Sequence, residues 1–205
     1  MKTPYYDSDE YILTPGEYDL AVILVEAVTF VAGRIGDNPI TFKLYFSEDF
    51  PRKLFGVGSL IQQIIIGLLD NAVKHSQGDT IKLAVTCSRD SEEDIWMDIV
   101  VSDYGIGIEE HNLTDIFKNI GQDGDDEVES AVMSLPLMKK ALDLIEGKIS
   151  VGSIVGLGSV FSVGVNQGYV SDEVIGSFIR DNIEFEIKDK MISPGITTEY
   201  ILKSD

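Results

Sequence analysis

The sequence has little of the chemistry that disulfide frameworks and most metal sites need. Its 205 residues include one cysteine, Cys87, so neither an internal disulfide nor a cysteine-based metal cluster can form. The two histidines, His75 and His111, are far apart in the chain, which argues against a histidine-based zinc site. A single cysteine fits a protein of a reducing compartment, and we expect a cytoplasmic location.

The chain also lacks long apolar runs and positive charge. No apolar run reaches about eighteen residues, so no transmembrane span is expected. The N-terminus lacks the basic start and apolar stretch of a signal peptide. Lys and Arg number 16 against 35 Asp and Glu, which gives a formal net charge of −19. This charge disfavours nucleic acid and anionic membrane surfaces as partners.

The apolar residues that are present follow regular periods and are numerous enough for one good-sized core. Spacings of three and four predict helices at residues 20–31, 61–72 and 135–145, with a short helical piece at 112–120. Alternation predicts strands at residues 40–46, 81–87, 95–101, 149–154 and 159–165. This order predicts an α+β fold, an α/β sandwich whose helices pack on one face of a mixed, mostly antiparallel sheet.

The pattern divides the chain into three parts. Residues 1–14 are polar and are expected to form a flexible N-terminal segment, and residues 15–166 form the main domain. The pattern weakens over residues 167–205, which we interpret as a C-terminal appendage or linker. A short helix at 170–181 and strands at 183–187 and 199–202 are expected within it.

The stretch that bears most on function is 99–108, an apolar strand that ends in Asp103 and the turn Gly105-Ile-Gly107. On its own it could be any tight turn at the edge of a sheet. The long apolar helix upstream, however, carries Asn and Lys one turn apart within 70–74. In a helix-on-sheet layout these two segments can face each other across a pocket.

Several segments together resemble the ATP-binding catalytic domain of bacterial hybrid sensor histidine kinases, of the superfamily shared with gyrase, Hsp90 and MutL. Residues 63–75 resemble the N box, 103–108 the first glycine box, 116–117 the F box, and 147–151 with 156–161 the closing hairpin. The resemblance covers roughly residues 17–165 and keeps the family's motif order. It implies the Bergerat-type ATPase fold.

At the adenine end the resemblance assigns five residues. Asp103 would accept a hydrogen bond from the adenine amino group, a donor that guanine lacks at that position. Gly105 and Gly107 would let the backbone approach the base, where a side chain would block it. Ile108 and Ser159 complete the nucleotide-binding set at this end, with Ser159 supporting the network around the base.

At the phosphate end the resemblance assigns two residues of the long helix. Asn71 would bind Mg²⁺ through its amide oxygen, a hard ligand for a hard cation. Lys74, one turn further along, would lie near a phosphate. Alone, each has an ordinary alternative, a solvated or capping amide for Asn71 and a surface lysine for Lys74. Their spacing favours the nucleotide site.

The resemblance further implies phosphoryl transfer from bound ATP and Mg²⁺ to a histidine outside this chain. Family kinases carry that histidine on a separate dimerisation domain, and neither His75 nor His111 lies in such a setting, so no catalytic residue is assigned here. The expected partners are the dimerisation and phosphoacceptor domain of the same parent kinase, and a response regulator or receiver domain. A cytoplasmic domain of a membrane-bound sensor would fit.

Two departures from the family pattern leave an alternative open. Gly67 stands where the N box usually has a second Asn, and 130–135, where a second glycine box is expected, contains no glycine. The preceding stretch 121–130 holds five acids and no base, which would repel phosphates unless Mg²⁺ intervened. The alternative is a degenerate, pseudokinase module that acts through protein contacts with weak or no nucleotide binding. A remoter one is a protein or metabolite kinase of the same fold.

Overall fold

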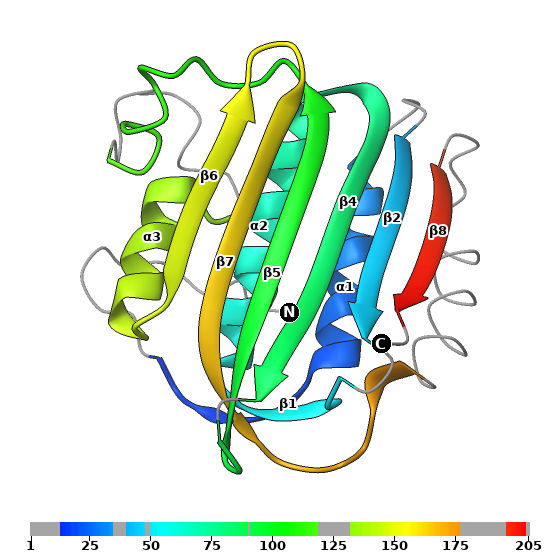
Figure 1. The fold of residues 1–205 in the computed structure, drawn as a ribbon, viewed down its shortest axis with the longest axis vertical. Helices are drawn as coiled ribbons and strands as arrows, with labels where there is room; N and C mark the ends of the chain where they lie inside the picture. The colour runs from blue at the N-terminus through cyan, green and yellow to red at the C-terminus, as the bar shows by residue number, and fades with distance from the viewer. Residues whose placement is uncertain are drawn as a thin grey trace.

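Figure 1 shows the computed structural model of the chain, in which a strongly twisted sheet covers a layer of helices. The structure describes residues 13–34, 40–47, 50–89, 91–118, 132–176 and 196–203. Most of the N-terminal segment, the acidic stretch 121–130 and the expected strand at 183–187 lie outside the described residues.

The strands of the described residues form one mixed sheet. They are β1 (Gly16–Asp19), β2 (Ile40–Ser47), β3 (Lys53–Gly56), β4 (Ser76–Arg89), β5 (Asp94–Gly105), β6 (Lys148–Ile154), β7 (Gly158–Tyr169) and β8 (Ile196–Lys203). Their order is β1-β3-β7-β5-β4-β2-β8, and β6 also pairs with β7. Strand β2 runs parallel to β4 and β8, and the other pairs are antiparallel. The predicted mixed, mostly antiparallel sheet is therefore confirmed.

The helices α1 (Leu20–Ala32), α2 (Gly58–His75) and α3 (Leu135–Leu144) all lie on the same face of this sheet (Figure 1). The central helix α2 packs against β5 of the sheet and against the helices α1 and α3. Its buried apolar side chains are Leu60, Ile61, Ile64, Ile65, Leu68, Leu69 and Ala72. The opposite face of the sheet carries no helix of the described residues. None of the helices within the described ranges has the length and apolar character that a bilayer span requires.

Most elements fall where periodicity predicts them, and the exceptions have local causes. Residues 110–118 form successive turns instead of the helical piece expected at 112–120. Their main-chain bonds mostly span three residues, for example from the Asp115 N–H to the Asn112 carbonyl at 2.9 Å. Asn, Thr and Asp are poor helix formers because their side chains compete for main-chain groups.

The sheet also uses more of the chain than the pattern indicated. The four-residue strands β1 and β3 pair with each other, and neither was predicted as a strand. At the other end of the chain β8 pairs with β2 over its full length. The segment interpreted as an appendage thus supplies a strand of the same sheet.

Candidate functional site

The register of β5 sets the direction of Asp103. Along this strand Ile95, Met97, Ile99 and Val101 are buried and alternate with more exposed residues. Asp103 is the next position of this buried series, so its side chain lies on the face that α2 covers. A carboxylate thus takes the last core-facing position of an otherwise apolar strand.

The carboxylate of Asp103 is held by main-chain donors. The Gly105 N–H donates a 2.8 Å hydrogen bond to Oδ1, and the side chain is almost fully buried. Burial raises the pKa of Asp103, and hydrogen bonds from the main chain of Gly105 and Ser159 partly offset that rise. A carboxylate has several acceptor positions, so a buried one held in this way is suited to accept a further hydrogen bond from an amino group of a ligand.

The glycines after Asp103 are required by close backbone contacts. A β-carbon at residue 105 would stand 1.9 Å from the carbonyl oxygen of His75, the last residue of α2. The Ile106 N–H donates to that same carbonyl at 3.3 Å. Gly107 has a φ of +70°, and a β-carbon there would stand 2.2 Å from the carbonyl oxygen of Ile154. The loop is therefore fixed between the end of α2 and the β6–β7 hairpin.

A serine that the sequence analysis did not select joins this loop to the hairpin. The hydroxyl of Ser153 accepts a 2.8 Å hydrogen bond from the Ile108 N–H and donates to the Gly158 carbonyl at 2.9 Å. It also lies 3.0 Å from the hydroxyl of Ser159, which is buried. Its position could have been noticed in the sequence, because Ser153 is a polar residue that continues the inward-facing series of Ile149 and Val151 on β6. The predicted Ile108 and Ser159 thus meet through Ser153.

Helix α2 presents the other two predicted residues. Asn71 is half-buried, and within the described part of the chain its amide makes no hydrogen bond, so its oxygen is available to a cation. Lys74 lies one turn later, with its Nζ 2.8 Å from Oδ2 of Asp70. The other oxygen of Asp70 is 3.0 Å from Nε of Arg34, which follows α1. Lys74 is thus paired within the helix.

Residues 132–134 bring the start of α3 against α2. Met133 is buried, and its carbonyl oxygen lies over Gly67, one turn before Asn71. Ser134 is the N-cap of α3, and Pro136 lies in its first turn, where its missing N–H costs no helix bond. This segment borders the part of α2 that bears the expected cation ligand.

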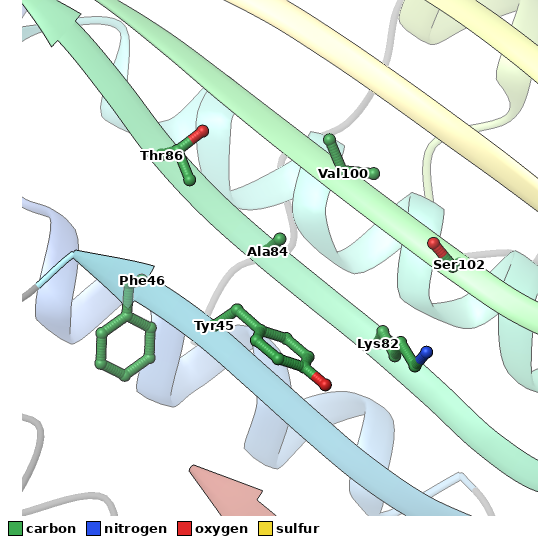
Figure 2. A pocket seen from close by; sticks show the side chains of 7 residues that line it. All are labelled: Tyr45, Phe46, Lys82, Ala84, Thr86, Val100 and Ser102. Carbon is green, nitrogen blue, oxygen red and sulfur yellow. The ribbon is translucent and has the colours of Figure 1, made fainter. Parts of the chain in front are cut away.

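A cavity of about 250 Å³ lies elsewhere, on the open face of the sheet. It is lined by Tyr45, Phe46, Lys82, Ala84, Thr86, Val100 and Ser102. Figure 2 shows Lys82, Ala84 and Ser102 on β4 and β5 with the helices behind the strands. Because Asp103 points to the helix side, this cavity is separate from the predicted site. The Lys82 ammonium in it already donates to the hydroxyl of Tyr104 at 2.7 Å.

The comparison with protein families decides the identity. A sequence model described as "Histidine kinase-, DNA gyrase B-, and HSP90-like ATPase" matches residues 56–168, a range that holds every predicted site residue. The chain belongs to this family. Its architecture and motif order are those of the ATP-binding catalytic domain of histidine kinases, as the resemblance implied.

Similar proteins include sensor kinases. The sensor histidine kinase RcsC of Salmonella typhimurium is 32% identical over 160 residues, which are 77% of this chain and 16% of RcsC. The chain thus spans about a sixth of that relative's length. Among solved structures, the mycobacterial sensor histidine kinase MprB has a TM-score of 0.57 at 17% identity, over 77% of this chain and 100% of that chain. Full-length ShkA in complex with AMPPNP has a TM-score of 0.58 at 16% identity, over 94% of this chain and 42% of that chain. The comparisons identify the chain as a histidine-kinase-type ATPase domain and lend no support to the degenerate module.

Proposed function

We propose that this histidine-kinase-type domain binds ATP with Mg²⁺ between the end of β5 and helix α2, and donates its γ-phosphate to a histidine on another domain of the parent kinase. The observation that carries the proposal is Asp103, a carboxylate buried at the end of β5 on the face that α2 covers. Main-chain donors of Gly105 and Ser159 orient this carboxylate, and we propose that it also accepts a hydrogen bond from the ligand.

The proposed recognition of adenine follows from the chemistry of Asp103. An ionised carboxylate only accepts hydrogen bonds, so it pairs with the adenine amino group and repels the carbonyl oxygen of guanine. Gly105 and Gly107 hold the loop close to this position, and Ser153 with Ser159 fixes it from the hairpin side. The residues act by orienting the base.

At the phosphate end the chain's own residues would position charge. The amide oxygen of Asn71 suits a hard cation because it is half-buried and makes no hydrogen bond within the described residues. When bound, Mg²⁺ would neutralise phosphate charge during transfer. Lys74 would move its ammonium from Asp70 to a phosphate oxygen. The nucleophile would come from outside, so this chain supplies positioning and electrostatic stabilisation.

The proposal extends to partners and location. The phosphoacceptor would be the histidine-bearing dimerisation domain of the same parent, and a receiver domain or response regulator would take the phosphoryl group next. The sensor kinases among its relatives support this proposal. A domain that uses ATP works where ATP is present, so we propose the cytoplasm.

Calorimetric titration of the 205-residue chain tests the proposal, with ATP and adenosine as ligands in the presence and absence of Mg²⁺. Asp103→Asn should weaken both ligands by about tenfold to a hundredfold, because a charge-assisted hydrogen bond is lost. Asn71→Ala should weaken ATP only when Mg²⁺ is present. Asp143→Asn, an exposed aspartate on α3, is the control. Equal affinities of the unmodified chain and Asp103→Asn would overturn the adenine assignment.

A further inference from the structure

The carboxylate of Asp70 is buried in α2 and has two cationic partners. Its side chain is 4% exposed, and its two oxygens are each engaged: Oδ1 by Nε of Arg34 at 3.0 Å and Oδ2 by Nζ of Lys74 at 2.8 Å. Both cations keep much of their side chains in solvent, at 40% for Arg34 and 57% for Lys74. The guanidinium of Arg34 also lies 5.4 Å from the centre of the Phe30 ring on α1, which holds it in place.

The geometry of the helix puts Lys74 between this carboxylate and the proposed phosphate end. Successive residues of an α-helix are rotated by about 100°, so Lys74 lies about 40° from Asp70 and about 60° from Asn71 around the axis. The same long side chain can therefore reach Asp70 or the space in front of Asn71. The structure shows it paired with Asp70.

Transfer of Lys74 from Asp70 to a phosphate would change the charge balance at Asp70. A buried carboxylate that loses its only counter-charge is strongly destabilising, because burial removes the compensating water. Asp70 keeps a second cation when Lys74 leaves, since Arg34, in the turn after α1, holds the other oxygen. Arg34 therefore lowers the cost of releasing Lys74.

We propose that Arg34 is a positioning residue for nucleotide phosphates, which acts by keeping Asp70 paired while Lys74 turns from Asp70 to the phosphate. Arg34 needs no contact with the nucleotide in this role. The inference rests on the proposed function, since it concerns the phosphate end of the same site. It assigns a part in phosphate binding to the contact between the turn that follows α1 and the C-terminal part of α2.

The test compares ATP with adenosine by calorimetric titration of the full chain in Mg²⁺. In Arg34→Gln, Lys74 is the remaining partner of Asp70 and stays with it, so ATP affinity should fall about tenfold while adenosine affinity stays unchanged. In Arg34→Gln with Asp70→Asn, no carboxylate retains Lys74, and ATP affinity should return to within about twofold of the unmodified chain. Arg34→Lys keeps the counter-charge and should bind ATP like the unmodified chain.

The control is Arg52→Gln, which removes an arginine that pairs with Asp19 at 2.7 Å and with Glu173 at 2.8 Å in another part of the fold. It should leave the ratio of ATP to adenosine affinity unchanged. An unchanged ratio in Arg34→Gln overturns the inference, as does a double variant as weak as the single one, because Arg34 would then act on the phosphate directly. Adenosine affinity confirms that each variant is folded. Failure of the proposed function is distinct, because the unmodified chain would then bind no ATP.

Discussion

The carbonyl oxygen of Met133 lies directly over Gly67, so a β-carbon on residue 67 would stand 2.9 Å from it. The same β-carbon would stand 2.9 Å from the Cε of Met138, a fully buried residue of α3. A glycine inside a helix normally costs about 0.8–1.0 kcal/mol relative to alanine. Here that cost is offset by the packing that only glycine permits, which joins α2 to the start of α3.

Replacement of Gly67 by alanine should therefore destabilise the protein, against the usual trend for a helix interior. The main-chain oxygen of Met133 cannot move without shifting the start of α3, so we expect a loss of about 1–3 kcal/mol from overpacking. Urea unfolding followed by circular dichroism measures the change.

The matched control is Gly152→Ala in β6. No atom lies within 4 Å of a β-carbon built there, and its φ is not positive. Alanine should be neutral or slightly stabilising at this position because glycine weakens a strand. A Gly67→Ala variant more stable than the unmodified chain would show that the contact between α2 and α3 is loose.

Sequence periodicity could predict the elements of this fold that are long enough to show a period. Sequence periodicity predicts helix α2 and strands β4 and β5 because their apolar residues repeat regularly over at least seven residues. Strands β1 and β3 span four residues each, which is too short for alternation to be distinguished from a connection. Strand β3 joins the sheet through β7, far along the chain, and β1 joins it through β3.

The candidate site divides in the same way. Asp103 and its glycines could be predicted because a local motif carries them, and register then explains why Asp103 faces α2. The sequence showed Gly67 only as a departure from the N box, and the close contact that it permits, with the carbonyl of Met133, lies 66 positions later. Arg34 pairs with Asp70 across two elements, and no periodic pattern encodes such a pair. Three-dimensional contacts supply the parts of the site that motifs do not.

Replacement of Ser153 by alanine should loosen the glycine loop from the hairpin. The change leaves the Ile108 N–H and the Gly158 carbonyl without their hydroxyl partner, at an expected cost of about 1–3 kcal/mol. Adenosine and ATP affinities should fall by the same factor, because the adenine end is affected and the phosphate end is not. Urea unfolding and calorimetric titration provide the two measurements.

Ser150→Ala serves as its control, because Ser150 lies on the same strand with an exposed side chain. Its stability should stay within about 0.5 kcal/mol of the unmodified chain. If Ser153→Ala behaved like Ser150→Ala, the hydroxyl would have no part in holding the loop.

The raised pKa of Asp103 predicts opposite effects of pH on stability and on adenine binding. Burial makes the folded protein hold the Asp103 proton more tightly than the unfolded chain does. Between the ordinary aspartate pKa and the higher pKa of Asp103, the folded state therefore binds more protons. Stability contributed by this group consequently falls as pH rises through that window. Adenosine affinity should rise over the same window, because the ionised carboxylate is the form that accepts the amino group.

Asp103→Asn isolates this effect from the other 34 acidic residues, since the chain has 35 Asp and Glu in total. As pH rises through the window, the unfolding free energy of the unmodified chain should fall relative to that of Asp103→Asn. Urea unfolding at a series of pH values measures this difference, and calorimetry at the same pH values measures adenosine affinity. Parallel stability profiles for the two proteins would mean that Asp103 titrates as an ordinary exposed aspartate. A rise in adenosine affinity that persisted in Asp103→Asn would assign the pH dependence to another group.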